Sequence, residues 1–270
     1  MASRAAPRSA QPAYVLHHHD WSESSLILDL FTREQGRIAV VAKGAKRPYS
    51  QLRSVLLPFQ RLNVVAGSGK RGDDSAEIHT LRTAEWAGGG AMLGGAALLS
   101  GFYLNELLLK GLARHDPHPR LFDAYALTLV ELGRDDDAGT QVALRAFELW
   151  LLRELGVLPQ LDLATLTQQP VTSATRYLLS PDTGVLRSPD EADALAGATL
   201  AALQAALDAH DLTALRQATR PALGPLRQQL RGLLHHLFGT DRLRTRQVML
   251  DLQRLSAATL PSVPPAPTAP

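Results

Sequence analysis

The chain of 270 residues contains no cysteine. This absence excludes a disulfide framework, a thiolate metal site and a cysteine nucleophile. It also fits a cytoplasmic protein, and we expect that localisation. Apolar residues make up 45% of the chain and charged residues 20%, which is ordinary for a globular protein with one large domain or two smaller ones.

Long uninterrupted apolar runs are missing as well. The longest apolar stretch, Ala91 to Leu109, is broken by glycine, serine, asparagine and glutamate residues. A membrane-spanning helix needs roughly 20 consecutive apolar residues, so this stretch predicts a buried amphipathic helix and no membrane partner. Residues 1–12 lack the apolar segment of a secretory signal, and residues 261–270 are rich in proline. We expect both ends to be flexible tails.

Signatures of catalysis are absent too. The chain has no Gly-x-Ser-x-Gly, no phosphate-loop signature and no His-Glu-x-x-His. The run Asp135-Asp136-Asp137 suggests a divalent metal, but three consecutive side chains on a loop diverge, and a solvated turn before a helix is favoured. In His17-His18-His19 only the first and last side chains share one side of a strand, so no metal is expected there either. We therefore expect a protein that is not an enzyme.

Short β-type runs fill residues 13–88. They lie at 13–19, 24–31, 37–43, 55–65 and 76–84. The segment from Thr32 to Gly36 predicts a hairpin connection, and the glycine-rich segment 67–74 predicts a flexible loop. Several such runs in a short stretch of chain predict a small closed or partly closed barrel. Phe31 and Phe59 lie in apolar runs and are expected to be core residues.

Beyond residue 88 the apolar period becomes helical. Asp116-Pro117 predicts a helix start, with aspartate at the N-cap and proline at the first helical position. The apolar run around Phe147 and Trp150 predicts a wholly buried helix, and helical patterns return at 192–207, 221–238 and 240–255. Residues 156–190 are irregular. The expected architecture is thus α+β, with a barrel domain at 13–88 and a helical domain at 89–260 that includes an irregular lobe at 156–190.

Charge is strongly separated along the chain, although the net charge is only +2. Between Arg33 and Arg71 there are nine basic residues and one acidic residue, Glu34. The net charge is +4 over residues 1–85, −9 over 116–211 and +6 over 212–270. Nucleic acid is the commonest partner of such basic surfaces. Solvated helix faces also produce charge blocks, so that alternative stays open.

The candidate DNA-binding residues are the cations of this basic band and of the last helix, with one tyrosine. Gly44 and Pro48 place the central cations on a turn, where they are free to contact phosphates. An aromatic side chain in the same polar loop is expected to contact a base or sugar. The cations near the last helix oppose its dipole, which suggests either an external anion or a solvated surface. The full set is Arg33, Arg37, Lys43, Lys46, Arg47, Tyr49, Arg53, Lys70, Arg71, Arg242, Arg244 and Arg246.

Several blocks of the sequence carry a resemblance to a known family. They are Glu23-Ser-Ser-Leu-Ile-Leu-Asp-Leu-Phe-Thr32, Lys43-Gly-Ala-Lys-Arg47, Leu57-Pro-Phe-Gln60, Tyr103-Leu-Asn-Glu-Leu-Leu-Leu109, His115-Asp-Pro-His-Pro119 and Leu144-Arg-Ala-Phe-Glu-Leu-Trp-Leu-Leu-Arg-Glu-Leu-Gly156. Through these blocks residues 13–255 resemble the RecO family of bacterial recombination mediators. The resemblance implies an N-terminal OB-fold barrel followed by a helical domain.

The same resemblance implies a function in recombinational DNA repair. Members of the family bind single- and double-stranded DNA and anneal complementary strands. With RecR, and in some settings RecF, they help RecA to displace single-strand-binding protein from DNA, and they are not enzymes. A competing hypothesis is an interaction scaffold whose basic barrel docks an acidic protein and touches DNA only incidentally.

The chain departs from the family pattern at one place. Many relatives carry four cysteines as a zinc module, and the matching positions here are Ala164, Thr167, Arg187 and Asp190. Alanine, threonine and arginine are not zinc ligands. We therefore expect no cofactor and a metal-free lobe held by apolar contacts. The leucines expected to make these contacts are Leu161, Leu166 and Leu186.

Overall fold

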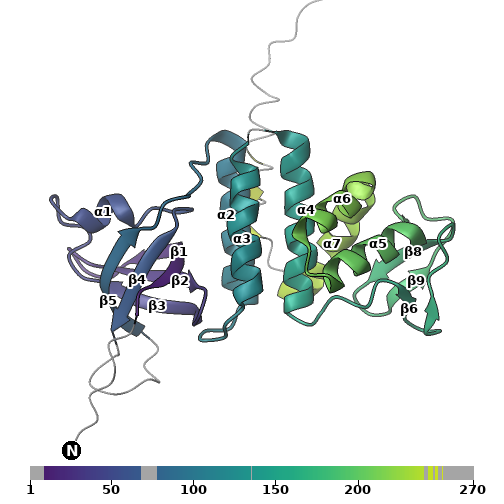
Figure 1. The fold of residues 1–270 in the computed structure, drawn as a ribbon, viewed down its shortest axis with the longest axis horizontal. Coiled ribbons are helices and arrows are strands. Elements are labelled where there is room, and N and C mark those ends of the chain that lie inside the picture. Colours follow the sequence, from purple (N-terminus) through teal and green to yellow (C-terminus); the bar gives the residue numbers. More distant parts are fainter. Residues whose placement is uncertain are drawn as a thin grey trace, which may run out of the picture.

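The protein is elongated, with a strand barrel at one end, long helices in the middle and a mixed lobe at the other end (Figure 1). The computed structural model describes residues 9–67, 78–134, 136–239, 243–245, 247–248 and 251. Most of both expected tails lies outside these residues, and the first strand already begins at Gln11. Within the described part of the chain, no helix is long and apolar enough to cross a membrane.

Five strands close the N-terminal barrel in the order β1-β2-β3-β5-β4. They are β1 (Gln11–Asp20), β2 (Leu26–Thr32), β3 (Gly36–Ala42), β4 (Leu62–Gly67) and β5 (Ile78–Trp86). All neighbouring pairs are antiparallel except β3 and β5. The hairpin predicted between Thr32 and Gly36 is confirmed, because these two residues are partners across β2 and β3. The barrel predicted from the short β-type runs is also confirmed.

The strand predicted at 55–65 is wrong over its first half. A short helix, α1 (Gln51–Val55), lies between β3 and β4, and β4 begins only at Leu62. Pro58 has no N–H for a strand ladder. Phe59 has a φ of 63°, and its ring is buried against Phe102 with the ring centroids 5.1 Å apart. The apolar run is therefore a turn that carries its aromatic side chain into the core, as was expected for Phe59.

The covered part of β1 and most of β2 are apolar on both faces. Val15, Leu28 and Val40 point inward and form the barrel's own core. Tyr14 and Phe31 alternate with them and belong to the core of the helical domain instead. An irregular register between residues 15 and 17 of β1 separates this covered part from the exposed end of the strand. The barrel thus joins the helices through the outer face of its first strands.

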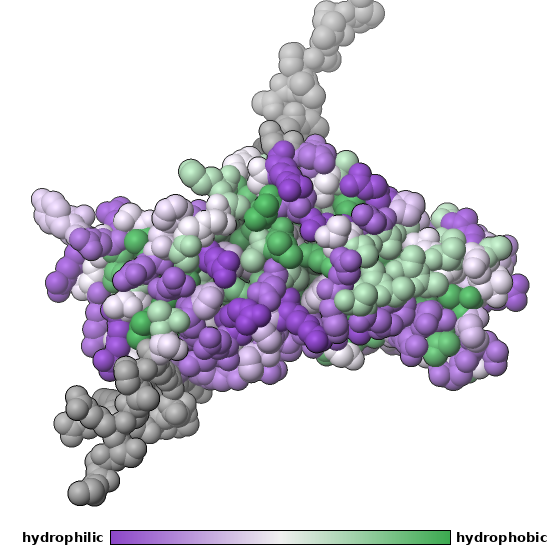
Figure 2. Space-filling model, viewed as in Figure 1, coloured by the Kyte–Doolittle hydropathy of each residue, from purple (hydrophilic) through white to green (hydrophobic). Residues whose placement is uncertain are grey.

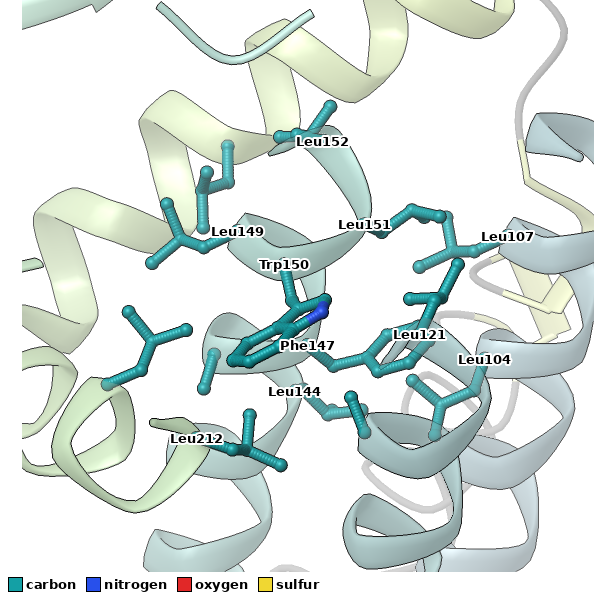
Figure 3. Packing of buried hydrophobic residues seen from close by; sticks show 14 of the residues in the cluster. Leu104, Leu107, Leu121, Leu144, Phe147, Leu149, Trp150, Leu151, Leu152 and Leu212 are labelled. Atoms are coloured by element: carbon teal, nitrogen blue, oxygen red, sulfur yellow. The ribbon is translucent and has the colours of Figure 1, made fainter. Parts of the chain in front are cut away.

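Helix α4 is the centre of the helical domain. Helices α2 (Gly95–Gly111), α3 (Pro119–Leu132) and α4 (Asp137–Glu154) stand side by side (Figure 1). Every residue of α4 from Val142 to Leu152 is buried, which confirms the predicted buried helix. In Figure 3 Phe147 and Leu151 lie toward the leucines of α2 and α3, whereas Leu149 lies on the opposite side. Asp136 caps the helix by accepting two main-chain N–H groups, so its part in a turn before the helix is confirmed.

Helix α3 starts later than predicted. Its first residue is Pro119 and its N-cap is His118, rather than Asp116 followed by Pro117. A proline disfavours helical backbone in the residue before it, so Pro119 keeps His118 out of the helix. Residues 112–118 instead cross the barrel, where the His115 N–H donates to the Arg37 carbonyl over 2.9 Å. The segment between α2 and α3 therefore connects the barrel to the helices.

The far lobe contains short helices and strands. The helices are α5 (Gly197–Asp208), α6 (Leu212–Thr219), the 3-10 turn η1 (Arg220–Ala222) and α7 (Leu223–Phe238). The strands are β6 (Leu163–Ala164), β7 (Gln169–Pro170), β8 (Arg176–Ser180), β9 (Gly184–Arg187) and β10 (Leu195–Ala196). The segment expected to be irregular thus forms small sheets. Of the helix predicted at 240–255, only a few residues are described.

The apolar contacts of this lobe differ in part from the expected ones. Leu161 is fully buried, as predicted. Leu166 and Leu186 are 69% and 38% exposed, so the prediction was wrong for both. Side chains alternate along a strand, and on β9 it is Val185 that points inward and Leu186 that points outward. Tyr177 and Leu179 of β8 complete the buried set.

Candidate nucleic-acid interface

The segment between β3 and α1, which we call the basic turn (residues 43–50), has a fixed backbone. Gly44 has a φ of 73°, a conformation that suits glycine. Ala45 is buried in the barrel core. The Lys46 N–H donates to the Ser24 carbonyl over 3.0 Å, and the Arg47 N–H donates to the Gly44 carbonyl over 3.1 Å. The backbone therefore faces the barrel, and the polar side chains face solvent.

Most of the predicted cations of this region are exposed. Lys43 and Arg47 lie on the basic turn, Arg53 lies on α1, and Tyr49 is 99% exposed. Among the described residues, none of these three cations forms an ion pair with an acidic side chain. Lys46 differs, since its Nζ is 3.2 Å from an Asp20 carboxylate oxygen and donates to the Ser22 carbonyl. The turn brings together cations and an aromatic ring that are available to a polyanion.

Two predicted cations lie instead where the barrel meets the helices. Arg33 donates two hydrogen bonds of 3.0 and 2.9 Å to the carboxylate of Asp123 on α3, and these bonds raise its pKa. Arg37 donates to the Leu112 carbonyl over 3.1 Å, and burial lowers its pKa. Arg37 and Lys43 lie at opposite ends of β3. The basic band of the sequence is thus divided between two places.

Of the predicted cations near the last helix, only Arg244 lies within the described residues. The Arg244 main-chain N–H donates to a Glu106 carboxylate oxygen of α2 over 2.8 Å, and its side chain is exposed. The other Glu106 oxygen accepts from the N–H and the hydroxyl of Thr245. Glu106 therefore holds the start of the last segment against α2. Lys70, Arg71, Arg242 and Arg246 lie outside the described residues.

A cluster around Asp29 was not found from the sequence. Asp29 is buried in β2, and three cationic or titratable side chains surround it. Its carboxylate oxygens are 3.5 Å from Arg37, 3.6 Å from Arg114 and 3.7 Å from His19. The one signal for it is an aspartate in the middle of the apolar run Leu26 to Phe31. A buried carboxylate needs such partners, because desolvation disfavours its charge.

Polar residues of α2 also fix the barrel against the helices. Asn105 is buried, and its amide donates to the Leu16 carbonyl of β1 over 3.0 Å. Its amide oxygen accepts from the Tyr125 hydroxyl of α3, a group whose pKa is raised well above its usual value by burial. A buried amide with both ends satisfied specifies one arrangement of three elements.

Exposed apolar side chains gather elsewhere. In Figure 2 apolar residues are visible over the central helices, with hydrophilic residues around them. The exposed apolar side chains of α2 and α3 are Leu98, Phe102, Leu127 and Val130. The basic turn lies beside α1 at the other end of the barrel (Figure 1). The apolar surface of α2 and α3 is thus separate from the basic turn.

A closed five-stranded barrel with cations and an exposed aromatic on one turn defines a protein of the OB type, a class that binds oligonucleotides and oligosaccharides. Comparison with known families gives the particular member of this class. A model described as "Recombination protein O N terminal" matches residues 8–88, and one described as "Recombination protein O C terminal" matches residues 94–247. The chain belongs to the RecO family.

Individual relatives agree with this assignment. DNA repair protein RecO of Albidiferax ferrireducens is 53% identical over 251 residues, which cover 92% of this chain and 97% of that protein. The protein of the same name from Polaromonas sp. strain JS666 is 51% identical over 247 residues, or 91% of this chain and 97% of the relative. The resemblance drawn from the sequence blocks is confirmed, and membership in the family supports a role in recombinational DNA repair.

Proposed function

We propose that this chain is a non-enzymatic DNA-binding protein of recombinational repair, which binds single- and double-stranded DNA and anneals complementary strands. The observation that carries the proposal is the basic turn, whose exposed Lys43 and Arg47 stand beside the exposed ring of Tyr49. Cations that neutralise phosphates let two strands approach with less Coulombic repulsion. Bases stack on exposed aromatic rings without sequence preference. This combination suits annealing of any complementary pair.

The proposal extends to partners and location. With RecR, and indirectly with RecF, the protein helps to load RecA onto DNA covered by single-strand-binding protein, in the cytoplasm and at the nucleoid during repair. Family membership supports this part. The exposed apolar side chains over the central helices offer surface for protein partners away from the basic turn.

Replacing Lys43, Arg47 and Arg53 with alanine is expected to weaken oligonucleotide binding at low salt, irrespective of base sequence. Each phosphate contact contributes about −0.7 to the log–log salt slope on single strands, so a protein with about five contacts has a slope of about −3.5. The triple variant is expected to lose about 2 units of that slope. Anisotropy titrations of a labelled oligonucleotide at several salt concentrations measure both quantities.

The control is a variant with the same change in charge at exposed arginines of the far lobe, Arg187, Arg227 and Arg231. It is expected to keep most of the affinity and the slope. Equal losses in both variants would show that net charge rather than the basic turn determines binding. A wild-type protein that ignores naked oligonucleotide but binds an acidic protein would favour the scaffold hypothesis.

We also propose that the lobe at residues 156–190 folds without zinc. The positions that match the family's zinc ligands carry Ala164, Thr167, Arg187 and Asp190, which do not form a zinc ligand set. Hydrogen bonds from side chains to the main chain hold the lobe instead. The Val185 N–H donates to the Thr165 hydroxyl over 2.8 Å, and the Thr172 N–H donates to the Tyr177 hydroxyl over 2.9 Å.

Gln229 of α7 makes the central contact of the lobe. Its side-chain oxygen accepts from the Leu179 N–H over 2.8 Å, and its side-chain nitrogen donates to the Asp193 carbonyl. Gln229→Ala is expected to lower the free energy of unfolding by about 1–3 kcal/mol, because buried main-chain groups lose their partners. Gln228→Ala, at an exposed position of the same helix, is the control with little expected effect. Urea unfolding measures both.

The proposal of a zinc-free lobe has a second testable consequence for the wild-type protein. A metal that binds only the native state stabilises it by mass action, so its removal lowers the urea midpoint. Because the proposed lobe binds no zinc, addition of a chelator is expected to leave the urea midpoint of the wild-type protein unchanged. Elemental analysis that finds one zinc per purified chain, or a midpoint that falls with chelator, would contradict the proposal.

A further inference from the structure

The exposed end of β1 carries a row of imidazoles, which we call the histidine row (His17, His18 and His19). All of them are exposed and follow the register irregularity of the strand. The rings of His17 and His19 are 4.4 Å apart, and those of His17 and His18 are 6.0 Å apart. Imidazoles held this closely offer several ring N–H donors to one external anion.

The histidine row lies between the basic turn and Arg244. At one end β1 continues to Asp20, which pairs with Lys46 of the basic turn over 3.2 Å. At the other end Arg244 lies near enough to His17 to lower its pKa. The main chain of Arg244 is held there by Glu106 of α2. Four consecutive strand residues span roughly 10 Å, so the row covers a short distance between the basic turn and Arg244.

Charged side chains of both signs surround the row. The acids of the neighbouring elements are Asp20 of β1, Glu23 of the turn after β1, Asp29 of β2 and Glu106 of α2. Asp20, Asp29 and Glu106 each have a cationic or N–H partner. The cations are Arg37 of β3, Arg114 of the segment before α3, Lys46 of the basic turn and Arg244. Asp29 is 6% exposed, whereas the side chains of His19 and Arg114 are 57% and 38% exposed. Asp29 is thus turned inward, whereas the Asp20 side chain is 76% exposed and pairs with Lys46.

We propose that the histidine row is a phosphate-binding segment of this protein, along which the sugar–phosphate backbone of a nucleic acid runs from the basic turn to Arg244, and that its affinity rises when the imidazoles are protonated. The inference rests on the proposed DNA-binding function and adds a site to it. The basic turn and Arg244, which are far apart in the sequence, then act as one track.

The direction of the pH dependence follows from His17. His17 is exposed but its ring is partly desolvated, and this desolvation is the first cause of its lowered pKa. His19 and His18 lower the pKa further, Arg244 acts in the same direction, and Asp29 opposes them. A phosphate placed beside the ring raises that pKa again. Between the free and the bound pKa, binding takes up a proton, so affinity increases as pH falls through this interval.

The test compares wild-type protein with His17→Asn/His19→Asn, using a labelled thymidine oligonucleotide at about pH 8 and about pH 6, on either side of the usual histidine pKa. The wild type is expected to bind up to about tenfold more tightly at the lower pH for a shift of one pKa unit. Its salt slope is expected to steepen by about 0.7 for each newly engaged phosphate. The double variant is expected to match the wild type at the higher pH and to lose the gain.

A matched control removes two exposed imidazoles of α7, His235→Asn/His236→Asn, and is expected to keep the gain. Melting curves at both pH values check that each variant is folded. Arg244→Gln provides a second variant in which the main-chain contacts to Glu106 remain. It is expected to bind more weakly at both pH values, because an exposed cation at the end of the proposed track is removed.

The outcomes distinguish failure of the proposed histidine row from failure of the proposed DNA-binding function. A gain that persists in the histidine variant, or a wild type that binds equally at both pH values, overturns the histidine row and leaves DNA binding intact. A wild type that binds no oligonucleotide at either pH overturns both. A gain that is lost with the row and kept in the α7 control, together with weaker binding by Arg244→Gln, supports it.

Discussion

Replacing Glu148 with alanine is expected to lower the free energy of unfolding by about 3–5 kcal/mol. Glu148 lies in α4 at 1% exposure, where its carboxylate accepts from the Arg145 guanidinium and from the Tyr103 hydroxyl of α2. The alanine leaves the buried guanidinium without its counter-charge and the tyrosine hydroxyl without this acceptor. The loss is a large fraction of the total stability of a typical domain, about 5–15 kcal/mol.

A second pair in the same protein provides the control. Arg134 and Glu131 also stand three residues apart with a 2.9 Å contact, but the Arg134 side chain is 65% exposed. Arg134→Ala is therefore expected to cost at most about 1 kcal/mol, as exposed pairs do. Urea unfolding followed by far-UV circular dichroism measures both variants. Equal costs would mean that burial of the Arg145–Glu148 pair does not determine its importance.

Gly36→Ala is expected to lower the free energy of unfolding by about 2–5 kcal/mol, because it disturbs the contact between the barrel and the segment before α3. Gly36 has a φ of 66°, where a side chain is strained. A Cβ at this position would also overlap the main-chain carbonyl of Asp116, in the segment that crosses the barrel between α2 and α3. Main-chain atoms cannot turn away as a flexible side chain can, so the crossing segment must shift and its hydrogen bond to Arg37 is strained.

Gly88→Ala separates the two causes. Gly88 has a φ of 76°, but a Cβ there meets nothing within 4 Å. This variant therefore carries the backbone strain without the overlap, and it is expected to cost about 1–2 kcal/mol. Urea midpoints of the two variants give the contribution of the overlap by difference. A Gly36 variant as stable as the Gly88 variant would show that the crossing segment tolerates the added group.

Local patterns were sufficient wherever neighbours in the sequence decide the structure. The hairpin between Thr32 and Gly36 and the buried helix around Phe147 were both found from the sequence. They depend on turn residues and on side-chain periodicity. Prolines produced two of the errors, since Pro58 interrupts the predicted strand and Pro119 delays the start of α3. In the first case a residue without a main-chain N–H outweighed an apolar pattern, and in the second the ring of Pro119 outweighed a capping pattern.

In the candidate site, too, contacts between sequence neighbours could be predicted and contacts between distant residues could not. The exposed cations of the basic turn were predicted from Gly44 and Pro48, which are close to them in the chain. The position of Arg33 could not be predicted, because its partner Asp123 is 90 residues away. For the same reason the cluster at Asp29 was missed, although an aspartate within an apolar strand marked it. Partners of this kind exist only after the barrel and the helices have packed.

The amino-acid sequence by itself determined the division into a barrel and a helical domain, the burial of α4 and the exposure of the basic turn, because the spacing of apolar residues and the chemistry of turns act over a few neighbouring residues. Only the tertiary structure decided that Arg33 and Arg37 join the domains and that β1 connects the basic turn to Arg244. Those contacts depend on the outer face of the barrel meeting α2 and α3, and burial of that apolar face brings distant charges together.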